Sequence, residues 1–315
     1  MREGRTPVEE AALAAEGQAA RTWAFDEGEE IAPGRSAFQL LGGGRGHEAY
    51  LAWDERLFGL VVVKILRPHR AEDPFARQQI AAEARAYTAL QHPALPRSFG
   101  SDVHGGRPYL VLEFLDGPRL STLVRKQGRL AVEQTLPLAL QLCSALHYMA
   151  GEGWVHLDVK PKNVVMGAPP RLIDLSIART REGALRTGGP IGTDAYMAPE
   201  QCGVEGMGEM GPAADIWGLG VTVYEAITGH LPFPASREDG PPRERFPQLV
   251  HEPIPFSKQI PPVLGDPIMS CLRKRPEARP TAEELAGALQ PLVAALPKPS
   301  IVPRIRPRVR RRSPR

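Results

Sequence analysis

The segment VHLDVKPKN, residues 155–163, is followed by the apolar VVM and by RLIDLS, which ends at residue 176. In this part of the chain apolar residues recur at helical spacing over 132–150, 215–228, 267–273 and 281–295. Upstream, the runs FQLL, AYLAW, GLVVVKILR and PYLVLEFL are typical of strands and surround one helical pattern at 76–90. The sequence therefore predicts an α+β fold of two lobes, a small antiparallel sheet with one helix and a larger, mainly helical lobe.

Length and composition are those of an ordinary globular protein with a basic tail. The 315 residues are 42% hydrophobic and 24% charged, enough to bury a core in one domain or two apposed lobes. The net charge of +3 conceals an arginine-rich stretch at 304–315, without which the body would be acidic. We expect an N-terminal extension at 1–35, an N-lobe at 36–114, a C-lobe at 115–296 and a basic, disordered tail at 297–315.

The cysteines and the hydropathy pattern favour a reducing compartment. Cys143, Cys202 and Cys271 lie far apart without CxxC spacing, so the sequence predicts neither disulfides nor a cysteine zinc site. No apolar run reaches the roughly 18 residues that a membrane span needs, and the longest candidate, 136–149, has the spacing of a buried helix. We therefore expect a cytoplasmic protein without a transmembrane segment.

A glycine cluster and a lysine suggest a phosphate-binding site in the N-lobe. Gly42, Gly43 and Gly44 stand between two predicted strands, where backbone N–H groups can approach phosphate oxygens; a glycine-rich hairpin without a ligand is the alternative. Lys64 ends the apolar run VVVK, and Glu83 on the next predicted helix is a candidate for its anionic partner. Such a pair would hold nucleotide phosphates between the lobes. Alternatively, the Lys64 ammonium reaches solvent and Glu83 lies on an exposed helix face.

Three ordered motifs resemble those of the protein kinase family. They are the H-x-D-x-K-P-x-N pattern of VHLDVKPKN, the aspartate of RLIDLS after an apolar strand, and the later GTDAYMAPE. The resemblance covers roughly residues 36–295 and implies a bilobal kinase fold, ATP as the phosphate donor and proteins as substrates. The lysine two places after the first aspartate is similar to the serine/threonine branch. The variants HLDVKP and DLS, and the abundance of Arg, Ala, Gly and Pro, resemble bacterial, actinobacterial-like members of that branch.

The resemblance implies a role for each polar residue of these motifs. Asp158 would orient the substrate hydroxyl as the catalytic base, and Lys160 would steady the transferring phosphoryl group. Asn163 and Asp174 would supply oxygen ligands to Mg²⁺, with Mn²⁺ as a substitute. Thr193 of GTDAYMAPE is expected to contact Asp158 and Lys160 rather than to act as a switch.

The resemblance also implies which residues surround the nucleotide and which are structural. Leu112 would limit the depth of the adenine pocket. Glu200 would pair with Arg279, and Asp215 would cap the backbone of the catalytic loop from a buried helix. The residues expected to bind ATP are the phosphate-loop residues Leu41, Gly42, Gly43 and Gly44, then Lys64, the hinge residues Glu113 and Leu115, and finally Asn163 and Asp174.

Three positions depart from the family pattern. His47 stands where the third glycine of the phosphate loop is expected, which suggests weak ATP affinity. Leu157 replaces an arginine that in many relatives meets a phosphate on the activation segment. We therefore predict little dependence on phosphorylation of that segment by this route, although Thr180 and Thr187 are available for autophosphorylation. Ser176 replaces the glycine after the metal-binding aspartate, so large inversions of that segment should be costly.

Two other functions fit parts of the sequence. A pseudokinase that binds nucleotide or acts as a scaffold would explain the departures, whereas the tail at 304–315 would suit an anionic partner, either nucleic acid or a membrane surface. The sequence favours an active serine/threonine kinase and specifies no substrate, activating signal or oligomeric state. The argument for activity is the complete phosphoryl-transfer set, Lys64, Glu83, Asp158, Lys160, Asn163 and Asp174.

Overall fold

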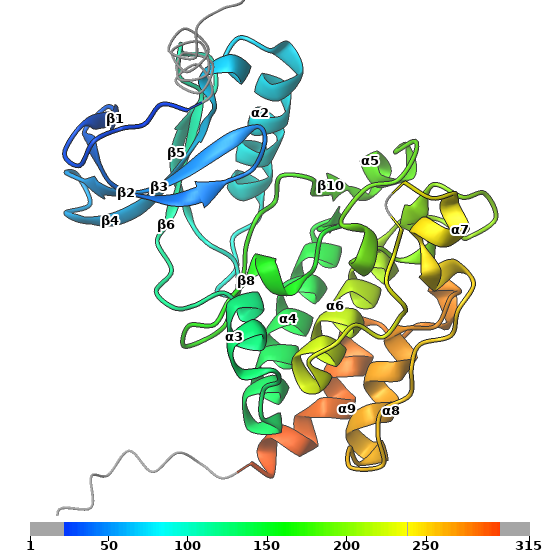
Figure 1. The fold of residues 1–315 in the computed structure, drawn as a ribbon. Helices are drawn as coiled ribbons and strands as arrows, with labels where there is room; N and C mark the ends of the chain where they lie inside the picture. Colours follow the sequence, from blue (N-terminus) through cyan, green and yellow to red (C-terminus); the bar gives the residue numbers. More distant parts are fainter. Residues whose placement is uncertain (1–21, 238, 297–315) are drawn as a thin grey trace, which may run out of the picture.

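The computed structural model describes residues 22–237 and 239–296. The predicted basic tail and most of the predicted N-terminal extension lie outside these residues. Figure 1 shows a strand-rich N-lobe, drawn in blue and cyan, packed against a helical C-lobe drawn from green to orange. This is the two-lobed α+β architecture that the sequence predicted.

One antiparallel sheet forms the N-lobe, with the strand order β1-β2-β3-β4-β6-β5. Alternating residues of its long strands, such as Tyr50, Ala52, Val61 and Val63, bury their side chains in one apolar cluster. The first strand pairs with the second although it lies in the predicted extension, because Ile31 fills the same cluster. The strands are β1 (Glu30–Ala32), β2 (Arg35–Gly43), β3 (His47–Asp54), β4 (Gly59–Leu66), β5 (Ser98–Asp102) and β6 (Tyr109–Glu113).

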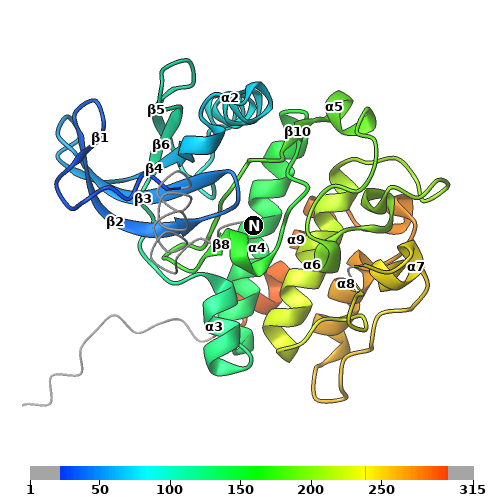
Figure 2. The ribbon, with the colours of Figure 1, turned by 45° about the horizontal axis from the view of Figure 1, so that its top comes forward.

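One α-helix, α2 (Pro74–Ala89), lies beside this sheet (Figure 2). It begins where the Asp73 side chain accepts a hydrogen bond from the Phe75 N–H, with proline at the first helical position. Its buried residues include Ile80, Glu83 and Tyr87, which recur every three or four residues. This spacing directs the Glu83 carboxylate and the Tyr87 ring toward the cleft between the lobes.

Five helices make the framework of the C-lobe, and α4 packs against both α6 and α9. Four of them, α4, α6, α8 and α9, confirm the predicted helical regions, with bounds shifted by up to five residues, whereas α3 was not predicted. Their buried apolar faces join those of α2 and β6 in one cluster that spans both lobes. The helices are α3 (Leu120–Gln127), α4 (Val132–Gly151), α6 (Pro212–Thr228), α8 (Pro262–Cys271) and α9 (Ala282–Ala294).

The segment at 235–262 is mostly exposed and irregular. It contains α7 (Pro242–Arg245) and the 3-10 turn η5 (Pro247–Leu249), and the side chains of Phe246 and Gln248 are buried. These buried residues contact the activation segment, as described below.

Short elements between the lobes carry the predicted motifs. Strand β7 leads into residues 156–163 and pairs with β10. Strand β8 follows these residues and pairs with β9, so the two pairings hold the two ends of this loop. Within the described residues, no helix is long and apolar enough to cross a membrane, and the three cysteines are free and buried. The short elements are η1 (Pro68–Arg70), β7 (Trp154–Val155), η2 (Pro161–Asn163), β8 (Val164–Val165), β9 (Arg171–Leu172), β10 (Arg179–Thr180), α5 (Arg181–Leu185), η3 (Asp194–Tyr196), η4 (Pro199–Cys202) and η6 (Pro276–Ala278).

Candidate active site

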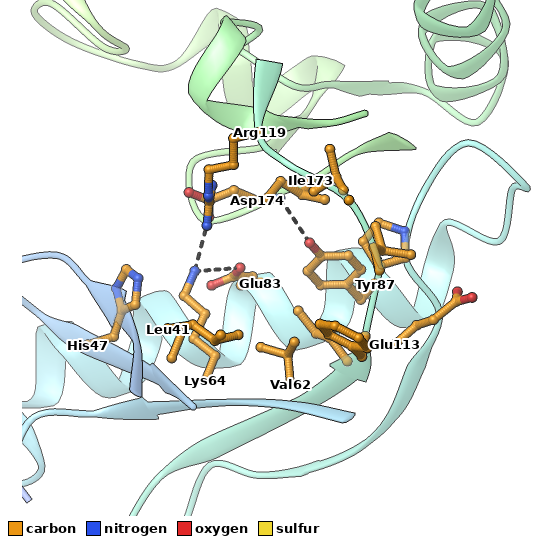
Figure 3. Close-up of a pocket in the computed structure, with 17 residues that line it drawn as sticks. Leu41, His47, Val62, Lys64, Glu83, Tyr87, Glu113, Arg119, Ile173 and Asp174 are labelled. Atoms are coloured by element: carbon orange, nitrogen blue, oxygen red, sulfur yellow. Dashed lines mark hydrogen bonds and ion pairs between the residues drawn. The ribbon is translucent and has the colours of Figure 1, made fainter. Parts of the chain in front are cut away.

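Lys64 forms two ion pairs, one within the N-lobe and one to the C-lobe. Its Nζ lies 2.8 Å from Glu83 Oε1 on α2 and 3.0 Å from Asp174 Oδ1 after β9 (Figure 3). Burial alone would lower the pKa of Lys64, but the two carboxylates raise it, so the ammonium stays charged. For Asp174 the effect of burial is outweighed by Lys64, which holds the pKa of that carboxyl below its usual range. The lysine therefore does not reach solvent as in the alternative arrangement.

The polar residues of VHLDVKPKN converge on one carboxylate. Lys160 Nζ lies 2.6 Å from Asp158 Oδ2, and Asn163 Nδ2 donates to the same oxygen at 2.9 Å. Thr193 donates to Asp158 Oδ1 at 2.8 Å and accepts a hydrogen bond from Lys160 at 2.6 Å. The expected contacts of Thr193 are thus present, and every bond fixes the orientation of the Asp158 carboxylate.

Buried side chains hold the backbone of the catalytic loop, residues 156–163. Asp215 of α6 accepts hydrogen bonds from the N–H groups of His156 and Leu157, each at 2.7 Å, as the sequence suggested. Gln201 donates to the Leu157 carbonyl at 2.8 Å. Leu157 has a φ of 66°, a left-handed conformation that is uncommon for leucine and is maintained here by these bonds. Burial raises the pKa of Asp215 to about 6.

The expected pair of Glu200 and Arg279 is also present. Both guanidinium nitrogens bond the carboxylate, at 2.6 and 2.8 Å, and neither side chain is exposed. Arg279 also donates to three backbone carbonyls and stacks over Trp217 at 5.0 Å. This buried pair ties the end of the activation segment to the C-lobe.

A cavity of about 270 Å³ opens between the lobes beside Lys64. Leu112 forms part of its wall, and the Glu113 carboxylate points away from it toward Arg97 and Arg171 (Figure 3). Glu113 therefore faces the cavity through its backbone. Of the residues expected to bind ATP, those that line it are Leu41, Lys64, Glu113, Leu115 and Asp174.

The three glycines form the end of β2 and the turn above this cavity. A Cβ on Gly43 would lie 2.3 Å from the His47 carbonyl oxygen, so no other residue fits there without a shift of the backbone. Gly42 has a φ of 130°, which also favours glycine. Neither these residues nor Asp158, Lys160 and Asn163 are among the described residues that line the cavity, so the catalytic loop lies beyond its edge.

Three polar residues outside the predicted site, His47, Tyr87 and Arg119, line the cavity. The ring of His47 lies beside Lys64 (Figure 3), and burial, then Lys64 and Arg67, lower its pKa to about 4, so the imidazole is neutral near pH 7. Tyr87 accepts a hydrogen bond from the Asp174 N–H at 3.0 Å. Tyr87 could have been found from the sequence because it lies four residues after Glu83 on one helix face. Arg119, which also lines the cavity, carries no such signal.

The donors suited to a divalent cation are two oxygen-bearing side chains. Asn163 uses its amide nitrogen on Asp158, which leaves its carbonyl oxygen for other contacts, and Asp174 keeps 30% of its side chain exposed. Over residues 22–237 and 239–296 no cluster of three or more His, Cys, Asp or Glu side chains could hold a metal. Two protein oxygens suit Mg²⁺, which commonly completes its shell with water and substrate phosphates.

Comparison with known proteins agrees with this geometry. A family model described as "Protein kinase domain" matches residues 36–288. The serine/threonine-protein kinase PknB of Mycolicibacterium smegmatis is 31% identical over 265 residues, which cover 80% of this chain and 41% of that protein. PknA of Mycobacterium tuberculosis is 32% identical over 277 residues, 83% of this chain and 62% of that protein.

The chain thus spans about two fifths of the length of its PknB relatives. The matches confirm the resemblance to bacterial serine/threonine kinases that the motifs suggested. Since the family match covers most of the chain and the two ion-paired centres stand where its motifs require, the chain belongs to the protein kinase family.

Proposed function

We propose that this protein transfers the γ-phosphate of ATP to serine or threonine hydroxyls of other proteins and of itself. The observation that carries the proposal is that two ion-paired centres are complete, one lining the cavity between the lobes and the other on the catalytic loop beyond its edge. The first is Lys64 with Glu83 and Asp174, and the second is Asp158 with Lys160 and Thr193. A chain that kept only the fold would have no need for both centres.

The chain's own residues would orient the reactants and neutralise charge. Asp158, held at both oxygens, would accept the proton of the substrate hydroxyl. Lys160, whose Nζ lies 2.6 Å from that carboxylate, would neutralise the negative charge that develops on the transferred group. Lys64, kept charged by Glu83, would bind nucleotide phosphates.

Asn163 and Asp174 would hold Mg²⁺ through their side-chain oxygens. Mn²⁺ could take its place, because it also prefers oxygen ligands. The metal would neutralise phosphate charge. Adenine would lie against Leu41 and the backbone of Glu113 and Leu115, with the phosphates under Gly42–Gly44. The His47 side chain, at the position where a third glycine is expected, supports weak ATP binding. A micromolar dissociation constant in a nucleotide titration would contradict this part of the proposal.

The alternative function is that of a pseudokinase that binds nucleotide or acts as a scaffold. His47 and Ser176 favour it, because both replace glycines near the phosphates. Ser176, however, donates a hydrogen bond to Asp174, which helps to keep that carboxylate charged. The substitution therefore does not remove the proposed metal ligand.

The test is incubation with γ-labelled ATP, Mg²⁺ and a generic protein substrate, followed by phosphoamino-acid analysis. We expect label on serine or threonine, and about a 10³-fold lower rate for Asp158→Asn, which removes the proton acceptor. Lys64→Met should also be inactive. Because that change leaves the buried Glu83 unpaired, Lys64→Met/Glu83→Gln should recover thermal stability without recovering activity. Nucleotide binding without transfer by the wild type would support the pseudokinase.

We further propose a cytoplasmic location, and an anionic partner for the arginine-rich stretch at 304–315, which lies outside the described residues. Its seven-arginine composition supports this, since basic tails bind nucleic acid or anionic lipid with strong salt dependence. Binding to a DNA duplex or to phosphatidylserine vesicles should weaken steeply between about 50 and 200 mM salt. For six phosphate contacts, the affinity should fall about 10³-fold over this range. Equal binding by a chain ending at residue 303 would contradict it.

A further inference from the structure

Adjacent residues of β3 connect the nucleotide cavity to the opposite face of the sheet. His47 lines the cavity, and Glu48, the next residue, points to the other side because side chains alternate along a strand. The Glu48 side chain is only 1% exposed. A carboxylate buried to this degree requires partners, and three side chains or N–H groups provide them.

Arg67 is the charged partner of Glu48 and also holds the glycine-rich turn. Its Nη1 lies 2.8 Å from Glu48 Oε1, and its Nε donates to the Gly44 carbonyl at 2.9 Å. The backbone N–H of Arg67 donates to the Gly46 carbonyl at 3.1 Å. One residue therefore fixes two carbonyls of the turn that lies above the phosphate site.

Trp23 supports this pair from the N-terminal side. Its backbone N–H donates to Glu48 Oε2 at 3.2 Å, and its indole Nε1 donates to the Leu66 carbonyl, directly before Arg67, at 2.7 Å. The guanidinium of Arg107 lies over the Trp23 ring at 4.9 Å and over the Phe25 ring at 5.3 Å. Phe25 in turn packs edge-on against Tyr50, whose hydroxyl donates to Glu48.

We propose that Trp23, Glu48 and Arg67 are positioning residues that preorganise the glycine-rich turn for nucleotide, so that the segment before the sheet controls ATP affinity. The inference rests on the proposed nucleotide site and extends it. Without the third glycine, the turn carries the bulk of His47, and its shape depends on these external bonds. A turn that is ordered before binding loses less conformational entropy when phosphates bind.

The test compares Arg67→Met, Arg67→Lys and Trp23→Phe with the wild type. Trp23→Phe keeps an aromatic ring but removes the indole N–H that bonds Leu66. The matched control is Trp53→Phe, because Trp53 lies on the same sheet and its ring contact is Phe58, at 5.2 Å. The readouts are the dissociation constant for MgATP by calorimetry, hydrogen exchange of residues 42–47, kcat at saturating ATP, and the KM for protein substrate.

We expect Arg67→Met to raise the MgATP dissociation constant about fivefold, which equals about 1 kcal/mol, and to speed exchange at 42–47. Trp23→Phe should act in the same direction by about twofold, with no additive effect in the double variant. Arg67→Lys should recover part of the affinity. In all variants kcat and the protein-substrate KM should stay within about twofold, because the catalytic loop is separate from this network.

A lower melting temperature with unchanged exchange at 42–47 and unchanged MgATP affinity would overturn the inference and leave a purely structural role. Neither binding nor exchange requires phosphoryl transfer, so a chain that binds MgATP but transfers no phosphate would contradict the proposed activity alone. If the wild type binds no nucleotide, the proposed site fails, and the exchange measurement alone decides whether these residues order the turn.

Discussion

The catalytic loop and the activation segment lie side by side, yet different kinds of residue hold them. The catalytic loop at 156–163 is fixed by Asp215, Gln201 and Thr193 through buried hydrogen bonds. The activation segment at 174–200 is held near Asp194 and Met197 by residues from the region around α7. The first arrangement follows the family motifs, whereas the second uses residues outside them.

Two side chains from this C-lobe region bind the activation segment directly. Arg245 forms a bidentate pair with Asp194, at 2.6 and 3.1 Å. Gln248 donates to the backbone carbonyls of Asp194 and Met197 at 2.9 and 3.0 Å. The segment is thus held by side chains that carry no phosphate.

The position of Leu157 supplies a further apolar contact. Leu157, at the position where the family resemblance leads us to expect an arginine, is 3% exposed in a cluster with Ala184 of α5 and Trp217 of α6. Ile177 and Ile191 of the activation segment pack against the same cluster. The activation segment of this chain is therefore packed against apolar side chains at the place where a phosphate and an arginine would otherwise hold it.

The largest effect should come from Asp215→Asn, which breaks the support of the catalytic loop. Asparagine can accept from one of the two N–H groups but presents its own N–H₂ to the other, so we expect a loss of about 3 kcal/mol in the free energy of unfolding. Denaturant titration measures it. Asp215→Glu is the control, because it keeps the carboxylate but shifts it away from the two N–H groups.

The pH dependence of that loss provides a second check. Because burial raises the pKa of Asp215 to about 6, the folded protein binds this proton more readily than the unfolded chain does. Wild-type stability should therefore rise relative to the asparagine variant as the pH falls from 6 toward 4. A difference that shrinks over this range would contradict the assigned burial.

The next largest effect should follow Thr193→Ala, which breaks the link between the two regions. Its hydroxyl donates to Asp158 and accepts from Lys160, so alanine leaves both charged groups without a shared partner. We expect kcat to fall about tenfold, with ATP affinity unchanged, in a steady-state assay. Thr193→Ser should recover most of the rate, and a serine variant as slow as alanine would refute the role of the hydroxyl.

These two changes affect residues that the sequence named, which reflects how short motifs fix local geometry. Asp158, Lys160 and Asn163 lie within one loop of six residues, so their spacing alone brings their side chains together. The contact between Lys64 and Glu83 was also predictable, because strand and helix periodicity directs both inward. Each of these groups depends on few conformational choices.

The contacts of Arg245, Arg67 and Trp23 could not be predicted in this way. Asp194 and Arg245 are 51 residues apart, and Trp23 and Leu66 are 43 apart, with no motif that relates them. Arginines in a proline-rich stretch resemble solvated surface residues. Only the packing of the whole chain determines which carboxylate each one meets.

A smaller effect should follow Arg245→Ala, which loosens the activation segment from outside. Losing a half-exposed bidentate pair should raise the KM for protein substrate about threefold, with the MgATP dissociation constant unchanged. The matched control is Arg243→Ala on the same short helix, whose side chain is exposed. Equal changes of the protein-substrate KM in both variants would show that the positive charge of α7 matters and the pair with Asp194 does not.

The smallest effect should follow removal of both candidate phosphorylation sites. Thr180 caps α5 by accepting a hydrogen bond from the Gly183 N–H, so Thr180→Asn keeps the cap while removing the phosphate acceptor. We expect Thr180→Asn/Thr187→Ala to retain activity within about twofold, since cap substitutions among Ser, Thr, Asn and Asp are nearly neutral. Leu157 offers no charge for a phosphate to pair with, so we expect the order of this segment to depend little on phosphate through this route. A tenfold loss in this double variant relative to untreated wild type, with an equal loss in wild type treated with a phosphatase, would show that phosphate orders the segment by a route other than Leu157.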